Sequence, residues 1–463
     1  MSESKVKSKL GASYWKLWSA TGISNLGDGI TSVAYPWLAS AVTRSPLLIA
    51  LSAVVSRLPW LIFTLHAGVI TDRFNRKHII VAMDTLRGIL TITVGVFVFL
   101  EKDSLPSLSE LTSLTYLETN YSLYFVILIT AFLFGLAEVL RDNSAQTMMP
   151  AVVEDKNLEK ANGRMWSAES LTNSFIGPPV GSFIIAIAIF LPFFVDAATF
   201  FIAAALIAAM KPTVKSFSPE SKSGPINFKA EIKEGFAWLW SHTLLRPMAI
   251  ILGLLNGIGS LTGAVFILFA QEVLDTTVFI FAILGTAGAV GGIAGGILGP
   301  KVAEKIGSGR SLALALFSMP LTTLLTGITS QWYLVWVLVA LGSFTAVLWN
   351  VVTVSLRQSL IPTNILGRVN SVYRFFAWGT IPIGSLLGGG LVAALQGPLG
   401  REMAFRSIYF VGAFLGFLLF IYAIRVLTTE AIDRARAAGA GHGRVRERVG
   451  QRVIQPRPLR QGA

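Results

Sequence analysis

Two charged side chains lie where membrane-spanning helices would be deepest in a bilayer. Asp28 follows Trp15, the start of a long apolar run, by about 20 Å of helical rise. Arg57 has a similar depth in the next run, which would return antiparallel. Because a charge inside a membrane is costly and faces a bundle interior or an aqueous cavity, Asp28 is predicted to bind a proton or sense a cation, with Arg57 setting its proton affinity. The alternative is a static ion pair that locks two helices.

Polar residues near Asp28 indicate a cavity in the middle of the protein. Asn25 and the glycines at positions 27 and 29 would let such a cavity open. Asn256 and Asn350, in two later apolar runs, are further candidates for its lining, as are the tryptophans at 37, 60, 349 and 378. Because aromatic residues in membrane proteins often form belts at the interface, these residues do not identify a substrate.

Other charged residues lie closer to the ends of the apolar runs. Asp84 and Arg87 are one helical turn apart, which predicts that they pair with each other. Glu138 and Glu169 are the next candidates, after Asp28, for a carboxylate that couples proton movement to transport. Asp196 is interpreted as a helix cap or an interfacial residue, because it lies near the start of its run.

The sequence contains no motif for enzyme chemistry. It has no G-x-x-x-x-G-K-[ST] phosphate loop, so ATP hydrolysis is not expected. The 4 histidines lack the spacing of metal ligands and form no visible nucleophile–His–acid set. The absence of cysteine excludes disulfides and thiolate metal sites. We therefore predict no enzymatic activity, no cofactor and no metal.

Outside these positions the chain is strongly apolar. Of its 463 residues, 53% are hydrophobic and 14% are charged, and the mean hydropathy is +0.65. A soluble protein of this length could not bury so much apolar surface. The apolar runs predict an all-α polytopic membrane protein with twelve transmembrane helices in two six-helix, pseudo-repeated halves. The predicted spans begin near Trp15, Pro46, Ile79, Tyr121, Met165, Pro192, Met248, Val278, Ser311, Gln331, Ser371 and Phe405.

The predicted organisation has five parts. They are a cytoplasmic tail (1–13), the first half (14–210), a cytoplasmic linker (211–246), the second half (247–427) and a basic, disordered cytoplasmic tail (428–463). In the linker, apolar residues recur at helical spacing between 228 and 240, which predicts an amphipathic helix in the membrane interface or an exposed linker. Short echoes favour duplication, since Met148-Met149-Pro150 after the fourth span resembles Leu360-Ile361-Pro362 after the tenth.

The basic residues predict the orientation. Most of the 38 Lys and Arg lie in loops on one side, and only positions 44, 102, 401 and 406 fall on the other. By the positive-inside rule, both termini are cytoplasmic in a multi-pass protein of the cell membrane. The net charge of +13 is therefore attributed to orientation and to contact with anionic membrane lipid, and not to nucleic acid.

A short charged segment, GVITDRFNRK from 68 to 77, connects the second and third predicted spans. It combines Gly68, which allows close helix packing, with Asp72 directly before Arg73, and with Arg76 after an asparagine turn. An ordinary cytoplasmic basic cluster would explain the charges alone. The spacing G-x-x-x-D-R-x-x-R-K nevertheless resembles the loop 2–3 signature of the major facilitator superfamily.

In that superfamily, the aspartate of this loop and nearby basic residues latch the outward-facing state at the inner side of the membrane. The resemblance implies that Asp72, Arg73 and Arg141 form such a latch, supported by Gly68 and Arg76. The alternative is a set of ordinary charges at the level of the lipid headgroups.

A second motif lies in the fifth predicted span, where Gly177-Pro178-x-x-Gly181 combines a proline kink with small residues. A generic helix kink would have the same composition. The pattern resembles the motif that marks exporters (antiporters) within the superfamily, and this resemblance implies export.

Two further segments narrow the resemblance. Arg141-Asp142-Asn143-Ser144 and Leu158-x-x-Ala161-Asn162-Gly163 resemble the branch that contains macrolide-efflux proteins and the enterobactin exporter. The similarity covers nearly all of residues 14–427. It implies a secondary active transporter that exports a bulky, often amphipathic drug or metabolite in exchange for protons, by alternating access.

Two other functions fit the same fold. A lipid or lysolipid flippase would need a lateral opening, which the sequence does not reveal. A non-transporting membrane sensor or scaffold would keep the fold without using Asp28. The sequence also leaves open whether the coupling ion is H⁺ or Na⁺, and a monomer suffices for each of these functions.

Overall fold

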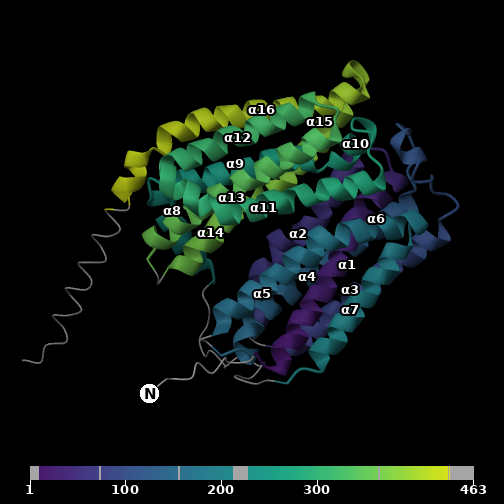
Figure 1. The fold of residues 1–463 in the computed structure, drawn as a ribbon, viewed down its shortest axis with the longest axis horizontal. Helices are drawn as coiled ribbons and strands as arrows, with labels where there is room; N and C mark the ends of the chain where they lie inside the picture. The colour runs from purple at the N-terminus through teal and green to yellow at the C-terminus, as the bar shows by residue number, and fades with distance from the viewer. Residues whose placement is uncertain are drawn as a thin grey trace, which may run out of the picture.

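The computed structural model describes residues 10–71, 74–154, 157–211, 228–362, 365–435 and 437. Within these ranges all regular secondary structure is helical (Figure 1). The first half contains α1 (Ala12–Val42), α2 (Pro46–Thr71), α3 (Arg76–Leu100), η1 (Glu110–Thr112), α4 (Tyr121–Val152), α5 (Leu158–Ser170), the π-helical segment η3 (Leu171–Ile176), α6 (Gly177–Ile187) and α7 (Leu191–Ala208). The second half contains α9 (Leu245–Gly263), α10 (Phe266–Glu272), α11 (Val278–Ile306), α12 (Ser308–Ile328), α13 (Trp332–Leu360), α14 (Leu366–Gly379), α15 (Ile381–Leu399) and α16 (Arg401–Val426).

The helices fit the predicted number of membrane spans. In the described part of the chain, 11 helices or successive helix pairs are long and apolar enough to cross a membrane. The helix α1, with 31 residues, is the twelfth, although polar residues lower its hydropathy. It packs against α4, α5, α6 and α7, so these polar residues can face protein and the cavity in place of lipid. The predicted twelve-span, all-helical fold is confirmed.

The two halves repeat the same packing. In the first half, α1 packs on α6 and α7, α3 packs on α4 and α7, and α2 packs on α4. In the second half, α9 packs on α15 and α16, α12 packs on α13 and α16, and α11 packs on α13. Spans in equivalent positions therefore have equivalent neighbours, as the predicted pseudo-repeat requires. Between the halves, α2 packs on α15 and α6 packs on α11. Because α2 is equivalent to α11 and α6 is equivalent to α15, these two contacts are also equivalent to each other.

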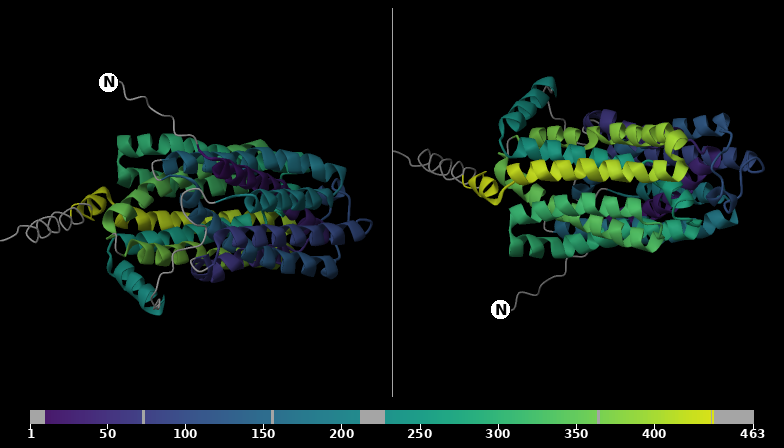
Figure 2. Two further views of the ribbon diagram at one scale, coloured as in Figure 1. Left: turned by 90° about the horizontal axis from the view of Figure 1, so that it is seen from below. Right: turned by 90° about the horizontal axis from the view of Figure 1, so that it is seen from above.

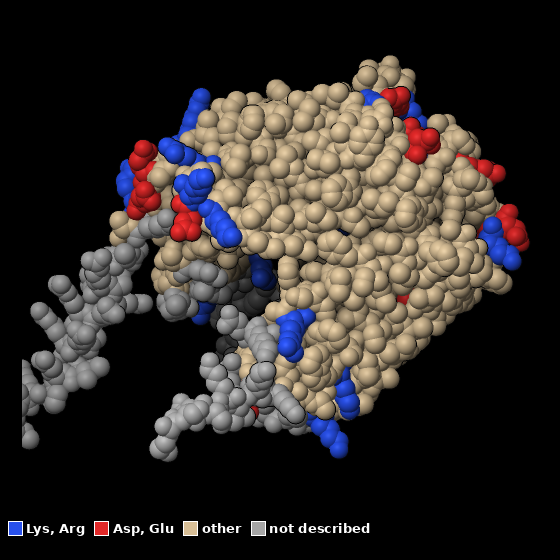
Figure 3. Space-filling model, in the orientation of Figure 1, with Lys and Arg blue, Asp and Glu red and all other residues tan. Residues whose placement is uncertain are grey.

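The two halves diverge toward one end of the bundle and meet at the other (Figure 1). We call the diverging end, which carries α5, α8 and α14, the linker end, and the opposite end the α10 end. Between the halves near the linker end, the molecular surface is hollowed (Figure 3). The two halves therefore form the opposite walls of a hollow at their interface.

The linker contains the helix α8 (Phe228–Ser241), which lies at an angle to the bundle at the linker end (Figure 2). Glu234 on α8 pairs with Arg368 of the second half, with 2.6 Å between Oε2 and Nη1. Leu239 is buried, whereas Phe236 and Trp240 stack on each other and remain 42% exposed each. The helix is therefore fixed to α14, and its location in a membrane interface stays a prediction.

Part of the C-terminal range 428–463, predicted to be disordered, is helical. Residues 429–435 form a separate helical segment, separated from the end of α16 by two residues, and Ile432 packs in a core cluster with residues of α12 and α13. This apolar contact gives the segment a buried side, which its basic composition does not indicate. Residues from 438 onward lie outside the described part of the chain.

A buried ion cluster joins the halves at the α10 end. Glu272, at the end of α10, contacts Arg44 between α1 and α2, and its Oε2 lies 2.5 Å from Nε of Arg401. Arg401 Nη2 donates to the Arg44 carbonyl at 2.8 Å, and Arg44 Nη1 donates to Gln271 at 2.5 Å. The exposed fractions of the Arg44 and Glu272 side chains are 2% and 7%. We call Arg44, Glu272 and Arg401 the clamp, because they connect the two halves.

We expect Glu272→Gln to loosen the α10 end. The substitution leaves two arginines without their buried counter-ion, a change that costs about 3–5 kcal/mol in buried pairs. Because the chain has no native cysteine, spin labels on Tyr121→Cys and Leu399→Cys report the separation of the halves at this end. Glu272→Gln should lengthen and broaden the distance distribution. Glu402→Gln, at a 65% exposed residue that pairs within α16, should not, and identical distributions for wild type and Glu272→Gln would contradict the role of the clamp.

Candidate functional site

A cavity of about 820 Å³ lies between the halves. Its first wall comes from α1, α2, α3, α4, α5 and η3 and carries every charged residue of the lining. Its second wall comes from α9, α10 and α11 and consists of Gly263, Ala264, Phe266, Ile267 and Phe281. The cavity thus has one polar, charged side and one apolar side.

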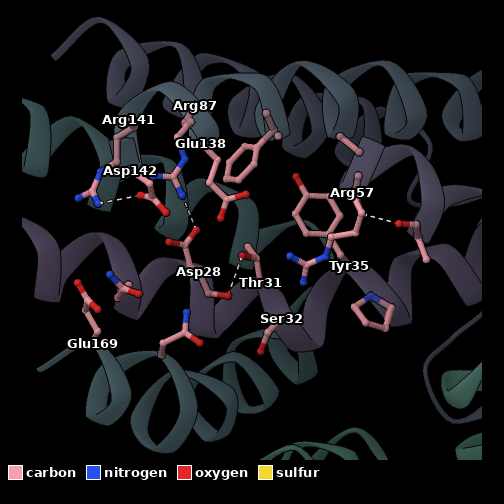
Figure 4. A pocket seen from close by; sticks show the side chains of 18 of the residues that line it. Asp28, Thr31, Ser32, Tyr35, Arg57, Arg87, Glu138, Arg141, Asp142 and Glu169 are labelled. Carbon is pink, nitrogen blue, oxygen red and sulfur yellow. Dashed lines mark hydrogen bonds and ion pairs between the residues drawn. The ribbon is translucent and has the colours of Figure 1, made fainter. Parts of the chain in front are cut away.

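Asp28 faces this cavity from α1 and pairs with Arg87 of α3 (Figure 4). The distance between Asp28 Oδ1 and Arg87 Nη2 is 2.7 Å, and 2% of the Arg87 side chain is exposed. The guanidinium carbon lies 4.6 Å from the ring centre of Phe134 and 4.1 Å from that of Phe200. Cation–π contacts of this kind stabilise a desolvated guanidinium, so the two rings help to hold Arg87 in place.

The ion pair continues into a chain of charges inside the first half. Arg87 Nη1 and Arg141 Nε each lie 3.4 Å from Oδ1 of Asp84, which is fully buried. Arg141 Nη1 lies 3.2 Å from Oδ1 of Asp142, which returns to the cavity wall (Figure 4). The predicted pair between Asp84 and Arg87 is confirmed. Two buried arginines are thereby matched by three carboxylates on α1, α3 and α4.

Arg57 does not pair with Asp28, so the alternative of a static ion pair between these two residues is wrong, whereas an influence of Arg57 on the proton affinity of Asp28 stays a prediction. It lines the cavity from α2 with an exposed side chain and forms no ion pair with any described residue. Its depth in the membrane resembles that of Asp28, but depth does not fix the direction of a side chain around the helix axis. Arg87, one turn from Asp84, has the position that was expected for Arg57.

The asparagines predicted to line the cavity separate into two groups. Asn25 lines it and donates to the Thr21 carbonyl at 3.0 Å. Asn256 and Asn350 are not among the lining residues. Asn256 donates to the Ala377 carbonyl at 2.7 Å and so links α9 to α14, and Asn350 donates to a carbonyl of its own helix at 3.1 Å. A polar residue within a membrane span can therefore serve to hydrogen-bond a backbone carbonyl, and it need not line a cavity.

Asp196 is a buried acid beside the site, and its interpretation as a cap or interfacial residue is wrong. The helix α7 begins at Leu191, and Asp196 is 0% exposed. Its Oδ1 accepts from Thr199 Oγ1 at 3.4 Å, whereas Oδ2 has no partner in the described part of the chain. A Cβ atom added to Gly27 would collide with Oδ1, so this carboxyl lies against the α1 backbone next to Asp28. The available signal was Gly27 itself, which permits this close approach.

The Gly-Pro motif places α6 directly against α1. A Cβ atom at Gly177 would lie 2.5 Å from Gly29 Cα, and one at Gly181 would collide with the Ile30 carbonyl oxygen. The π-helical segment η3 precedes Gly177, and Pro178 lies in the first turn of α6, where its missing N–H is tolerated. The motif therefore holds the α1 backbone at Gly29 and Ile30, the two residues that follow Asp28.

The residues predicted for a latch are only partly described. Asp72 and Arg73 lie outside the described residues. Gly68 falls near the end of α2, and Arg76 is the first residue of α3. Arg141 forms its ion pairs with Asp84 and Asp142, within the first half.

Comparison with known proteins agrees with this architecture. Residues 11–449 match the model of a family described as transmembrane secretion effectors, within the major facilitator superfamily. The chain belongs to this family. It is therefore a multi-pass membrane transporter and not an enzyme.

Relatives of known function cover most of the chain. The multidrug efflux pump Tap of Mycobacterium tuberculosis is 24% identical over 393 residues, which span 81% of this chain and 86% of Tap. The macrolide efflux protein A of Streptococcus pyogenes is 20% identical and covers 81% of this chain and 88% of its own. The enterobactin exporter EntS of Escherichia coli is 24% identical, with coverage of 82% and 83%. The resemblance seen in the sequence is confirmed.

A solved structure shares the fold. A bacterial homologue of the iron transporter ferroportin, in an inward-facing state, superposes with a TM-score of 0.67 at 15% sequence identity. The alignment covers 91% of this chain and 100% of that chain.

We expect Gly177→Ala to destabilise the transporter. Alanine gains about 1 kcal/mol over glycine within a helix, but its methyl group would press on the α1 backbone, and overpacking costs about 1–3 kcal/mol. The matched control is Gly163→Ala, since a Cβ atom at Gly163 meets nothing within 4 Å. Thermal unfolding in detergent should give a lower Tm for Gly177→Ala and an equal or higher Tm for Gly163→Ala. An unchanged Tm for Gly177→Ala would mean that α6 is not held tightly against α1.

Proposed function

We propose that this transporter exports a bulky, amphipathic small molecule across the cell membrane in exchange for protons. The observation that carries the proposal is the Asp28–Arg87 ion pair in the wall of the cavity, at a separation of 2.7 Å. The export direction is supported by the names of the relatives, which are an efflux pump, a macrolide efflux protein and an exporter. The cavity volume of about 820 Å³ falls in the range of sites for drug-sized ligands.

The proposed orientation places the linker end and both termini in the cytoplasm. Because the halves diverge at this end, the cavity then faces the cytoplasm and can receive a substrate from inside the cell. The clamp holds the opposite, outer end closed in this state. Transport requires the clamp to open and the linker end to close. Gly68, Asp72, Arg73, Arg76 and Arg141 are proposed to form the latch that holds the closed linker end.

Proton coupling in this proposal acts through Asp28. In its charged form Asp28 attracts Arg87 strongly, because the pair lies in a medium of low dielectric constant. Protonation of Asp28 removes this attraction and leaves Arg87 with Asp84 as its remaining anionic partner. The charge that the cavity wall presents to a substrate therefore differs between the protonated and the ionised form of Asp28. A bias of a few kcal/mol from this difference changes the populations of the two facing states by orders of magnitude.

The test is proton movement in proteoliposomes, followed with a pH-sensitive dye while macrolides, dyes and siderophores are added. Wild type should show proton flux that depends on the compound, and Asp28→Asn should abolish it. Asp103→Asn, at an exposed acid between α3 and α4, is the matched control and should retain the flux.

Three results would change the proposal. Flux that persists in Asp28→Asn would move the coupling carboxylate to Glu138 or Glu169. Lipid translocation that is independent of a pH gradient would favour a flippase. Flux driven by Na⁺ in place of H⁺ would keep the export function and change the coupling ion.

A further inference from the structure

Four of the seven charged residues that line the cavity form ion pairs with described residues, whereas Arg57, Glu138 and Glu169 do not, and Arg57 is the one cation of the described lining without an ion pair. Asp28 is paired with Arg87, and Asp142 with Arg141. Glu138 accepts a hydrogen bond from Trp60 Nε1 at 3.1 Å. Arg57 has neither an ion pair nor a hydrogen bond to any of the described residues, and its side chain is exposed to the cavity (Figure 4).

The position of Arg57 is fixed by tight packing between α2 and α4. A Cβ atom at Gly135 would lie 2.8 Å from the Ser56 carbonyl oxygen and 3.0 Å from Pro59, so the two helices touch at the residues beside Arg57. One turn further along, Trp60 bonds to Glu138 of α4. Because both contacts lie on the α4 side of α2, Arg57 cannot turn into that interface and remains directed into the cavity.

An unpaired guanidinium is tolerated while the cavity holds water, but not when the cavity closes around a ligand. Arginine does not lose its proton in proteins, and a buried charge without a partner costs several kcal/mol. An acidic group on the ligand would remove this cost, since arginine binds carboxylate and phosphate groups in a bidentate manner. The opposite wall offers no competing anion, because it consists of apolar residues and glycine.

We infer that the substrate is an amphipathic molecule with an acidic group, which Arg57 binds while the apolar part lies against Phe266, Ile267 and Phe281. This inference rests on the proposed transport function and specifies its substrate class. Arg57 is then a specificity-determining residue, separate from the Asp28–Arg87 pair that couples protons. It also favours closure of the loaded cavity over closure of the empty one, because only the loaded cavity supplies an anion for Arg57.

The test compares two dyes that differ in one group, rhodamine B with a free carboxyl group and its ethyl ester. Binding to the purified transporter is measured by fluorescence anisotropy. Wild type should bind the acid about tenfold more tightly than the ester, the gain typical of a hydrogen bond to a charged group. Arg57→Gln should remove this preference and leave the affinity for the ester unchanged, whereas Arg57→Lys should retain part of it. Arg310→Gln, on α12 outside the cavity lining, should behave as wild type.

Several outcomes would overturn the inference. They are equal affinity of wild type for acid and ester, an equal loss for both dyes in Arg57→Gln, or no binding of either dye. The proton-flux experiment separates these outcomes from failure of the proposed function. Proton flux driven by uncharged compounds and lost in Asp28→Asn would leave the export function standing while the acidic substrate class fails. Absence of flux with every compound would remove the proposed function itself.

Discussion

The structure of the first half depends on the need to neutralise Arg87. Its guanidinium is buried among α1, α3, α4 and α7, where an uncompensated charge would be very costly. Asp28 and Asp84 supply the compensation, and Asp84 in turn also contacts Arg141. A buried ion pair contributes little net stability compared with apolar packing, so stability alone does not explain such a cluster. In the proposed mechanism its value lies in Asp28, the acid of the cluster that pairs with Arg87 at the cavity wall and exchanges protons there.

Close packing by glycine makes this arrangement possible. Gly27 admits the carboxyl of Asp196 and Gly29 admits Gly177, so α7 and α6 approach α1 on two sides. With α1 held in this way, Asp28 has few directions left and points to the cavity. The polar and small residues that lower the hydropathy of α1 are therefore those that place its charge. A helix of larger apolar residues would span the membrane more easily but could not bring these groups together.

The sequence predicts the features that depend on one helix and misses those that depend on two. The number of spans, the irregular helix geometry just before Gly177-Pro178 and the Asp84–Arg87 pair all follow from local composition or from spacing along one helix. The partner of Asp28 does not, because the rotation of α2 and α3 about their axes decides whether Arg57 or Arg87 faces it. For Asp196, only the close contact with α1 distinguishes a buried acid from an interfacial one. These contacts are set by tertiary packing, which a single sequence leaves undetermined.

The distribution of charge between the halves indicates how the protein can move. The cluster around Arg87 lies wholly within the first half, so rigid rotation of that half preserves it. The clamp crosses between the halves, and the same rotation must break it. Around the cavity, the second half presents only apolar residues and glycine, and these can slide past the first half without leaving polar groups unpaired. In the proposed transport cycle, the main electrostatic barrier to opening of the α10 end is therefore the clamp, while the response to protons is assigned to Asp28. Asp28 and the clamp lie at different places along the bundle. In this proposal, protonation of Asp28 within the first half shifts the equilibrium between the closed and the open clamp, which connects both halves.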